Sequence, residues 1–197
     1  FGTPRPPGAL RPGEVLDESR LPDFDFYFPM PRRDLTRHYR DRYFYVFHDR
    51  VALMKTSFGC PYKCNFCFCR KITNDHYFAR PLADVIGELK TIREKEIYIV
   101  DDDFLLSAPR LRTFLQLLRD YGIRKKYLVY GRADFIVEHP ELIREFKELG
   151  LRTVIVGLES FNDAELSAID KRTTRSINEA AMAILNRCGV DCYAAVI

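Results

Sequence analysis

The chain has 197 residues, of which 47% are hydrophobic and 30% are charged, which is enough apolar material for one globular domain. Its 31 basic and 28 acidic residues leave a formal net charge of only +3, which argues against a nucleic-acid-binding surface. The apolar runs are too short to cross a bilayer and the N-terminus lacks the pattern of a signal sequence, so we expect a cytoplasmic protein without membrane contact.

Residues 1–42 are predicted to form a proline-rich linker or arm that precedes a core at residues 43–197. They carry most of the prolines and show no helical or strand period. Within them, a basic stretch from Pro31 to Arg42 leads into three aromatic residues, which could bind phosphate and stack on bases. A solvated charged segment is the simpler interpretation, so nucleic acid is not expected as a partner.

Beyond residue 50, strand-like apolar runs alternate with amphipathic helical runs. Ser107 can cap a helix that Gly122 ends, and Ser176 with Glu179 has the spacing of a capping box ahead of another helix. Such alternation makes repeated βαβ units, which require a parallel sheet with the helices outside. The predicted strands are residues 51–56, 97–100, 127–130, 151–157 and 190–197, and the predicted helices are 81–95, 107–122, 140–150 and 176–189.

We therefore expect an α/β fold in the form of a partial (βα) barrel with about five parallel strands. A complete barrel of eight such units takes roughly 250 residues. The last predicted strand is apolar and would be left as an open sheet edge. We accordingly expect the core to be incomplete at its C-terminus and the chain to be a piece of a longer protein.

Four of the six cysteines lie between residues 60 and 69. Cys60, Cys64 and Cys67 have C-x3-C-x2-C spacing, and Cys69 follows. This crowding favours a metal or cluster site in a reducing compartment over disulfides. Three thiolates can hold a [4Fe–4S] cluster and leave one iron open for a small ligand. The loop follows the first predicted strand, at the end where barrel enzymes carry their chemistry.

This spacing, with the aromatic Phe66 before the last cysteine, resembles the signature of the radical SAM superfamily. The resemblance implies a partial TIM-type barrel in which Cys60, Cys64 and Cys67 hold a [4Fe–4S] cluster and Phe66 lies at the cofactor. It further implies that the open iron chelates S-adenosylmethionine, which is cleaved reductively to a 5′-deoxyadenosyl radical. A reductant such as flavodoxin or ferredoxin is the implied partner.

Polar residues follow three later strands, where the carboxyl ends of parallel strands meet at one mouth. Residues 101–103 are three adjacent aspartates, whose charges repel unless a ligand or solvent shares them. Arg132 can offer a planar fork to a carboxylate or to ribose hydroxyls, and a surface arginine is the alternative. The Asp-Asp-x-Phe and Gly-x-Glu-Ser elements resemble those of cobalamin-binding radical SAM enzymes. The resemblance implies that Asp101, Asp102, Glu159 and Ser160 bind the cofactor, and we expect Arg132, at an adjacent strand end, to bind it as well.

The favoured function is a cobalamin-dependent radical SAM methyltransferase or cyclase. The cobalamin-anchoring D-x-H-x-x-G pattern is absent from the sequence, so any cobalamin is expected from a domain outside this chain. A cobalamin-free enzyme such as a methylthiotransferase is the alternative, and an iron–sulfur electron carrier is the non-enzyme alternative, although a carrier needs no open iron. A zinc site on all four clustered cysteines is a further alternative. The substrate and the role of Cys69 stay open.

Overall fold

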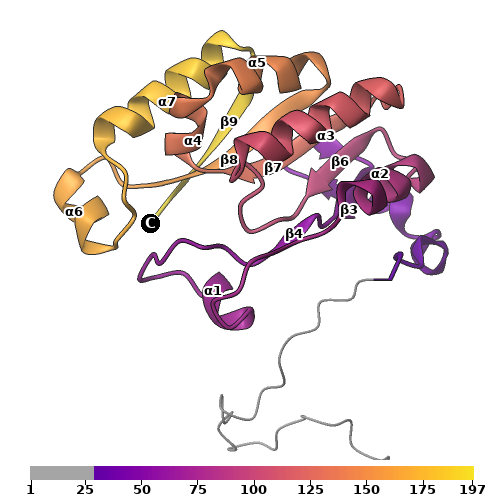
Figure 1. Cartoon of the computed structure of the whole chain (residues 1–197), viewed down its shortest axis with the longest axis horizontal. Coiled ribbons are helices and arrows are strands. Elements are labelled where there is room, and N and C mark those ends of the chain that lie inside the picture. The colour runs from indigo at the N-terminus through magenta and orange to yellow at the C-terminus, as the bar shows by residue number, and fades with distance from the viewer. Residues whose placement is uncertain (1–28) are drawn as a thin grey trace, which may run out of the picture. The chain divides into compact units, whose positions relative to one another are not determined.

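The computed structural model describes residues 29–197, and its central feature is a five-stranded sheet (Figure 1). The strands are β3 (Val51–Met54), β6 (Glu96–Ile99), β7 (Lys126–Gly131), β8 (Leu151–Glu159) and β9 (Asp191–Val196), in that spatial order. All four neighbouring pairs are parallel. The predicted α/β fold with five parallel strands is therefore confirmed.

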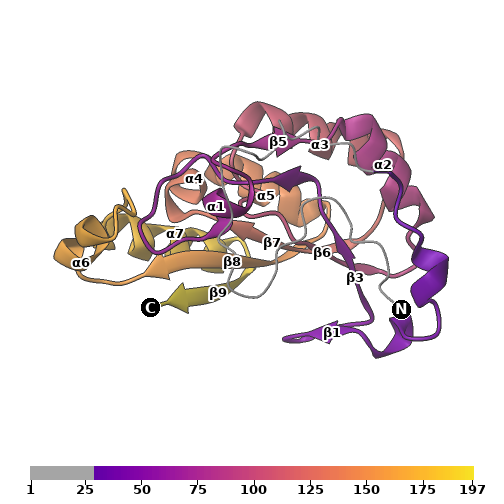
Figure 2. The same ribbon diagram turned by 90° about the horizontal axis from the view of Figure 1, so that it is seen from below.

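The connections between these strands carry helices that pack on one face of the sheet (Figures 1 and 2). These helices are α2 (Leu82–Thr91), α3 (Ala108–Asp120), α4 (Ala133–Glu138), α5 (Pro140–Glu148) and α7 (Arg175–Arg187), whereas α6 (Asp163–Ala168) lies beyond the end of β8. Apolar side chains such as Leu89, Phe114, Phe146 and Leu185 join the strands in one buried core. Among residues 29–197, no helix is long and apolar enough to span a membrane.

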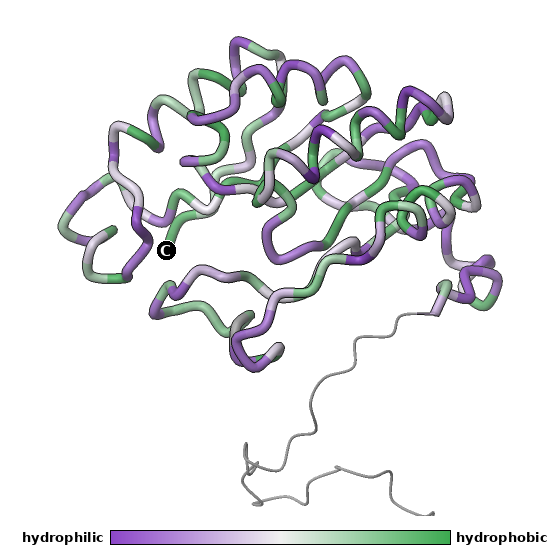
Figure 3. Tube along the Cα trace, viewed as in Figure 1, coloured by the Kyte–Doolittle hydropathy of each residue, from purple (hydrophilic) through white to green (hydrophobic). Residues whose placement is uncertain are grey.

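Side chains alternate between the two faces along each strand, as the pleat of a strand requires. In β6, Ile97 and Ile99 enter the core under the helices, whereas Tyr98 joins a smaller apolar group on the other face with Leu128 and Ile155. We call that other face the loop face. Both faces of the sheet are therefore apolar along its middle, as the hydropathy colouring of the strands also shows (Figure 3).

A segment that we call the cysteine loop, residues 57–79, leaves the end of β3 and contains the four clustered cysteines. The antiparallel pair of β4 (Ser57–Phe58) and β5 (Phe78–Ala79) closes its base, and α1 (Cys69–Ile72) forms its single helical turn. The loop lies at the carboxyl ends of the strands, where its cysteines meet residues that follow β6, β7 and β8 (Figure 1).

The compact unit that contains the sheet begins at Pro31, so residues 31–42 belong with it. They form two short 3-10 helices, Arg33–Thr36 and Arg40–Arg42, followed by a hairpin of β1 (Phe44–Tyr45) and β2 (His48–Asp49). Arg33 binds Glu88 and Arg40 binds Glu94. Two arginines of the basic stretch are thus paired with glutamates, one buried and one partly buried. The rest of the predicted arm lies outside the described residues.

Two predicted helix boundaries are wrong. Helix α7 is capped by Thr174, whose hydroxyl accepts from the amide of Ile177, and Ser176 lies inside its first turn. Helix α2 ends at Thr91 rather than at residue 95. The ammonium of Lys125 donates to the carbonyls of Ile92 and Glu94, which holds this stretch extended as it leads into β6.

Candidate functional site

A pocket of about 180 Å³ lies between the cysteine loop and the carboxyl ends of the strands. Cys60, Cys64, Cys67 and Cys69 all line it. Four of the residues predicted to contact a cofactor line it as well: Phe66, Asp102, Arg132 and Glu159. A larger pocket of about 600 Å³ near Arg37 and Arg93 contains no cysteine and none of the predicted residues. The chemistry of the lining, rather than size, therefore selects the smaller pocket.

The four thiols of the loop are free. Cys64 is buried, and its carbonyl accepts from the amide of Cys67 at 3.2 Å. Burial raises the pKa of Cys60 to about 11 and that of Cys69 to about 12, so both are neutral thiols without a bound cation. Among residues 29–197, no three His, Cys, Asp or Glu side chains are grouped to hold a single metal ion. The alternative of a four-thiolate zinc site gains no support from this arrangement.

Contacts to distant parts of the chain fix the shape of the cysteine loop. The amide of Asn65 donates to the carbonyl of Ile169 at 3.0 Å, and its side chain donates to the carbonyl of Ala168 at 3.1 Å. Gly59 has φ +79°, and a Cβ there would lie 2.0 Å from the carbonyl oxygen of His76. Only glycine fits this close approach of the two arms of the loop.

The first two aspartates of the 101–103 run do different things. Asp101 is 1% exposed and accepts from the amide and hydroxyl of Thr56, at 2.6 and 2.5 Å, and from the hydroxyl of Ser57 at 2.7 Å. It does not line the pocket, and its bonds hold the base of the cysteine loop. Asp102 does line the pocket, and it accepts from the amide of Gly59 at 2.8 Å.

Asp103 is a pocket residue that the sequence analysis did not select. It is 3% exposed, and neither carboxyl oxygen has a hydrogen-bond partner among the described residues. Burial raises its pKa to about 7, against the lowering effect of the nearby Arg132 guanidinium. A buried carboxyl group without partners is costly, so this geometry suits a ligand that donates hydrogen bonds to it.

Arg132 is buried, so the alternative of a surface arginine is wrong. Its guanidinium donates to Asp134 at 2.8 Å and to the carbonyl of Lys171 at 2.8 Å, and it stacks 3.7 Å from the ring centre of Tyr62. These contacts fix the orientation of the cation at the wall of the pocket.

Glu159 forms an ion pair with Lys171 at 2.8 Å, and both side chains line the pocket. The register of β8 against β9 shifts between Gly157 and Glu159, and Glu159 has φ +62°. The bulge turns the Glu159 carboxylate back over Gly157, where a Cβ would lie 2.6 Å from its oxygen. The sequence analysis did not select Lys171, and its position shortly after the Gly-x-Glu-Ser element was the one signal for it in the sequence.

Ser160 lies outside the lining of the pocket. Its hydroxyl accepts from the amide of Asn162 at 3.0 Å and bonds to Glu165. It therefore organises the turn into α6, beside the strand end that carries Glu159.

A parallel βα sheet with a pocket at the carboxyl ends of its strands is the arrangement in which barrel enzymes carry their active sites. The clustered thiols and the buried acidic and basic groups give this pocket the donor set of an iron–sulfur enzyme. The chain belongs to the Radical SAM superfamily, whose family model matches residues 54–197. The resemblance deduced from the cysteine spacing is thereby confirmed.

Two curated relatives illustrate the range of the family around this chain. The chain is 29% identical over 161 residues to the hopanoid C-3 methylase of Methylococcus capsulatus, covering 82% of this chain and 31% of that protein. It is 25% identical over 157 residues to the anaerobic magnesium-protoporphyrin IX monomethyl ester cyclase of Rubrivivax gelatinosus, covering 76% of this chain and 28% of that protein. The chain thus spans less than a third of the length of either relative.

Solved structures with the same fold include two proteins that were solved with cobalamin bound. OxsB, a cobalamin-dependent S-adenosylmethionine radical enzyme solved with aqua-cobalamin and S-adenosylmethionine, matches with a TM-score of 0.68 at 21% identity over 74% of this chain and 23% of OxsB. The radical S-adenosylmethionine methyltransferase TsrM from Kitasatospora setae, solved with cobalamin and a [4Fe–4S] cluster, matches with a TM-score of 0.64 at 21% identity over 74% of this chain and 30% of TsrM. At this identity the likeness shows the fold, which is the barrel-type architecture predicted.

Proposed function

We propose that this chain is the catalytic core of a radical SAM enzyme that binds a [4Fe–4S] cluster through Cys60, Cys64 and Cys67. One observation carries the proposal: these thiols line the same pocket as the buried, unpartnered carboxyl group of Asp103. The thiols suit the irons of a cluster, and Asp103 suits a ligand with hydrogen-bond donors. The residues present therefore fit both a cluster and S-adenosylmethionine.

A bound cluster supplies one-electron chemistry, through which radical SAM enzymes cleave S-adenosylmethionine to a 5′-deoxyadenosyl radical. In our proposal the pocket residues bind and orient that molecule. Asp103 accepts hydrogen bonds from its ammonium group, and the cations of Arg132 and Lys171 face its carboxylate. Glu159 accepts from the ribose hydroxyls, and Phe66 contacts the cofactor beside the cluster. Asp102 and Asp101 position the cysteine loop, since they accept hydrogen bonds from the amides of Gly59 and Thr56 at its start.

For the reaction on substrate we propose a cobalamin-dependent methyltransferase or cyclase, since the relatives above include methylases, a cyclase and cobalamin-dependent proteins. The described residues provide no observation that fits cobalamin, and we derive no step through it. A cobalamin-free enzyme such as a methylthiotransferase is the second candidate. An electron carrier is disfavoured, because it has no use for a buried, unpartnered Asp103 in the pocket of the cysteines. The reductant, flavodoxin or ferredoxin, stays part of the proposal.

Anaerobic reconstitution tests the cluster. We expect about four iron and four sulfide per chain, with strong loss in the Cys60→Ala, Cys64→Ala and Cys67→Ala variants. Cys69→Ala is the matched control, since it removes a thiol of the same loop and should keep its iron. Tetrahedral zinc with four sulfur ligands in X-ray absorption would overturn the assignment.

Binding of S-adenosylmethionine to the reconstituted protein tests the pocket. Asp103→Asn and Glu159→Ala should keep their iron and bind the cofactor at least about tenfold more weakly, as expected when a charge-assisted hydrogen bond is lost. Ser160→Ala, next to Glu159 but outside the pocket, should bind normally. Unchanged affinity in both pocket variants would remove these residues from the site.

A further inference from the structure

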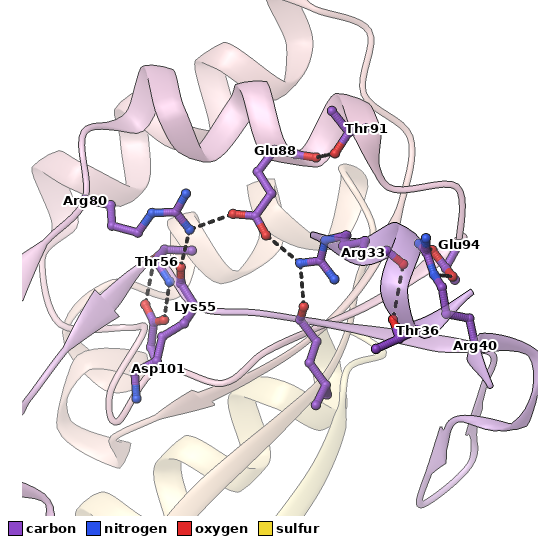
Figure 4. Close-up of polar contacts among 11 residues, drawn as sticks. Arg33, Thr36, Arg40, Lys55, Thr56, Arg80, Glu88, Thr91, Glu94 and Asp101 are labelled. Carbon is purple, nitrogen blue, oxygen red and sulfur yellow. Dashed lines mark hydrogen bonds and ion pairs between the residues drawn. The ribbon is translucent and has the colours of Figure 1, made fainter. Parts of the chain in front are cut away.

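Glu88 connects two segments that lie far apart in the sequence, and it lies outside the pocket. It belongs to α2, and its side chain is 1% exposed. Figure 4 shows Arg80 and Arg33 directed at its carboxylate from two sides. Arg80 follows β5 at the end of the cysteine loop, and Arg33 belongs to the segment before β1. One buried carboxylate thus joins both segments to the same helix.

On the side of Arg80, the contacts reach the chain that enters the cysteine loop. The Nη1 atom of Arg80 donates to Glu88 at 2.7 Å and also to the carbonyl of Lys55 at 2.6 Å. The amide of Arg80 donates to the carbonyl of Thr56 at 2.9 Å. Arg110 donates to the carbonyls of both Arg80 and Thr56, at 2.9 and 3.2 Å. Entry and exit of the loop are therefore held together at one point.

The same point is continuous with the aspartates at the end of β6. Thr56 binds Asp101 through both its amide and its hydroxyl, and the side chain of Lys55 lies 3.4 Å from Asp102. Asp102 in turn lines the pocket and holds the amide of Gly59, the residue before Cys60. An unbroken series of contacts therefore runs from Glu88 to Gly59, the residue before the first cysteine.

We infer that Glu88 is a positioning residue for the cysteine loop, acting through Arg80 on the backbone at Lys55 and Thr56. This inference rests on the proposed function, in which that loop holds the cluster. Burying one carboxylate between two arginines costs desolvation that an apolar contact would avoid. What is gained is a fixed orientation of Arg80, because its guanidinium cannot rotate away while Glu88 binds it. The distance between the entry and the exit of the cysteine loop therefore stays constant.

Glu94 provides a matched control. It is 11% exposed, follows α2, and binds Arg40 of the same N-terminal segment (Figure 4). Among the described residues it has no hydrogen bond or ion pair with the cysteine loop. Glu88→Gln and Glu94→Gln each break a partly buried Glu–Arg pair of this segment. Only the first one releases Arg80.

Hydrogen–deuterium exchange of the cluster-free protein gives the first readout. In Glu88→Gln, amides of residues 57–79 should exchange about tenfold faster than in the unchanged protein, because local opening of the loop becomes easier. In Glu94→Gln the same amides should exchange at the unchanged rate. Equal exchange of the loop in the two variants would overturn the inference.

The electron paramagnetic resonance spectrum of the reduced cluster gives the second readout, which a loss of stability alone would not move. Glu88→Gln should broaden or shift the signal, whereas Glu94→Gln should give the unchanged spectrum. Arg80→Lys, which keeps a charge beside Glu88 but not the fork that reaches the carbonyl of Lys55, should reproduce the loop effect if Glu88→Gln does not fold. Normal loop exchange in Arg80→Lys would overturn the inference. If the unchanged protein takes up no cluster, the proposed function fails, while the exchange comparison still decides the role of Glu88.

Discussion

The helix side of the sheet and its pocket end bury very different side chains. Under the helices, the core is built from apolar residues such as Leu89, Phe114 and Phe146. At the strand ends on the loop face, the buried side chains include charged groups, among them Asp103 and Lys171. Burial of apolar side chains under the helices stabilises the folded protein. Burial of charged side chains at the strand ends costs desolvation free energy, which is offset only where hydrogen-bonding or oppositely charged partners exist. Stability therefore comes mainly from the helix-covered face of the sheet, and ligand binding is expected at the carboxyl ends of its strands.

The largest loss of stability should follow a cavity on the helix side. Phe114 is 1% exposed and packs edge-on against Phe104, Tyr127 and Phe146. Phe114→Ala should lower the free energy of unfolding by about 3 to 5 kcal/mol, measured by urea denaturation. Phe161→Ala, at a side chain that is 41% exposed, should cost far less. Similar costs in the two variants would contradict the division into two regions.

Asp103→Asn, at the pocket end, should raise the stability of the protein rather than lower it, and it should do so only at high pH. The pKa of Asp103 is raised from 3.8 to about 7, so above pH 4 the unfolded chain releases a proton that the folded chain retains. The contribution of Asp103 to the stability of the cofactor-free protein therefore falls as the pH rises from about 4 to about 7 and then levels off. Asparagine cannot ionise, so the variant should be more stable than the unchanged protein by about 4 kcal/mol at pH 8, from about three pKa units of about 1.4 kcal/mol each. Denaturation at pH 4 and pH 8 checks this, and a difference that does not depend on pH would contradict it.

Gly157→Ala should disturb the pocket more than the fold. Its Cβ would lie 2.6 Å from the Glu159 carboxylate and 2.7 Å from the Lys171 ammonium, which can move apart. We expect a loss of about 1 to 2 kcal/mol in unfolding experiments, together with weaker cofactor binding. Gly87→Ala is the control, because no atom lies within 4 Å of a Cβ there. In that helix interior alanine should instead stabilise the protein by about 0.5 to 1 kcal/mol.

The smallest effect concerns the cap of α7 on the helix side. Thr174→Ala removes the hydroxyl that accepts from the amide of Ile177 and should cost about 1 kcal/mol in thermal or urea unfolding. Ser176→Ala, two residues further on, should be nearly neutral. A larger loss from Ser176→Ala would restore the capping box that the sequence suggested.

Sequence patterns predicted the sheet well, because each strand is a short apolar run between turn residues. All five strands were located, with ends that differ by a few residues. The ends of α2 and α7 were misplaced for physical reasons. Lys125 binds carbonyls after α2 from another part of the chain, and two neighbouring hydroxyl residues could each have capped α7. Contacts distant in sequence leave no local pattern.

The site could be predicted where the spacing of residues in the sequence identifies the chemistry. It was harder to predict where the role of a residue depends on the direction in which its side chain points. The cysteine spacing identified the loop and the family. Among the three aspartates, sequence reasoning favoured the first two, but the turn after β6 sends Asp101 to the loop base and Asp103 into the pocket. Lys171 meets Glu159 in the pocket, and the bulge that turns Glu159 is not visible in the residue pattern of β8.

The strand order β3-β6-β7-β8-β9 has a consequence for how the loop face is covered. A doubly wound sheet reverses its strand order, places helices on both faces and binds ligands at the reversal. Here the order never reverses, so every crossover helix is on the same face, and the cysteine loop covers the pocket end of the other face. If our proposal holds, the cluster and its ligand fill space that another helical layer would occupy in such a sheet. Binding of the cofactor then completes the packing of this end of the sheet, and it adds to the free energy of unfolding by an amount set by its affinity and concentration.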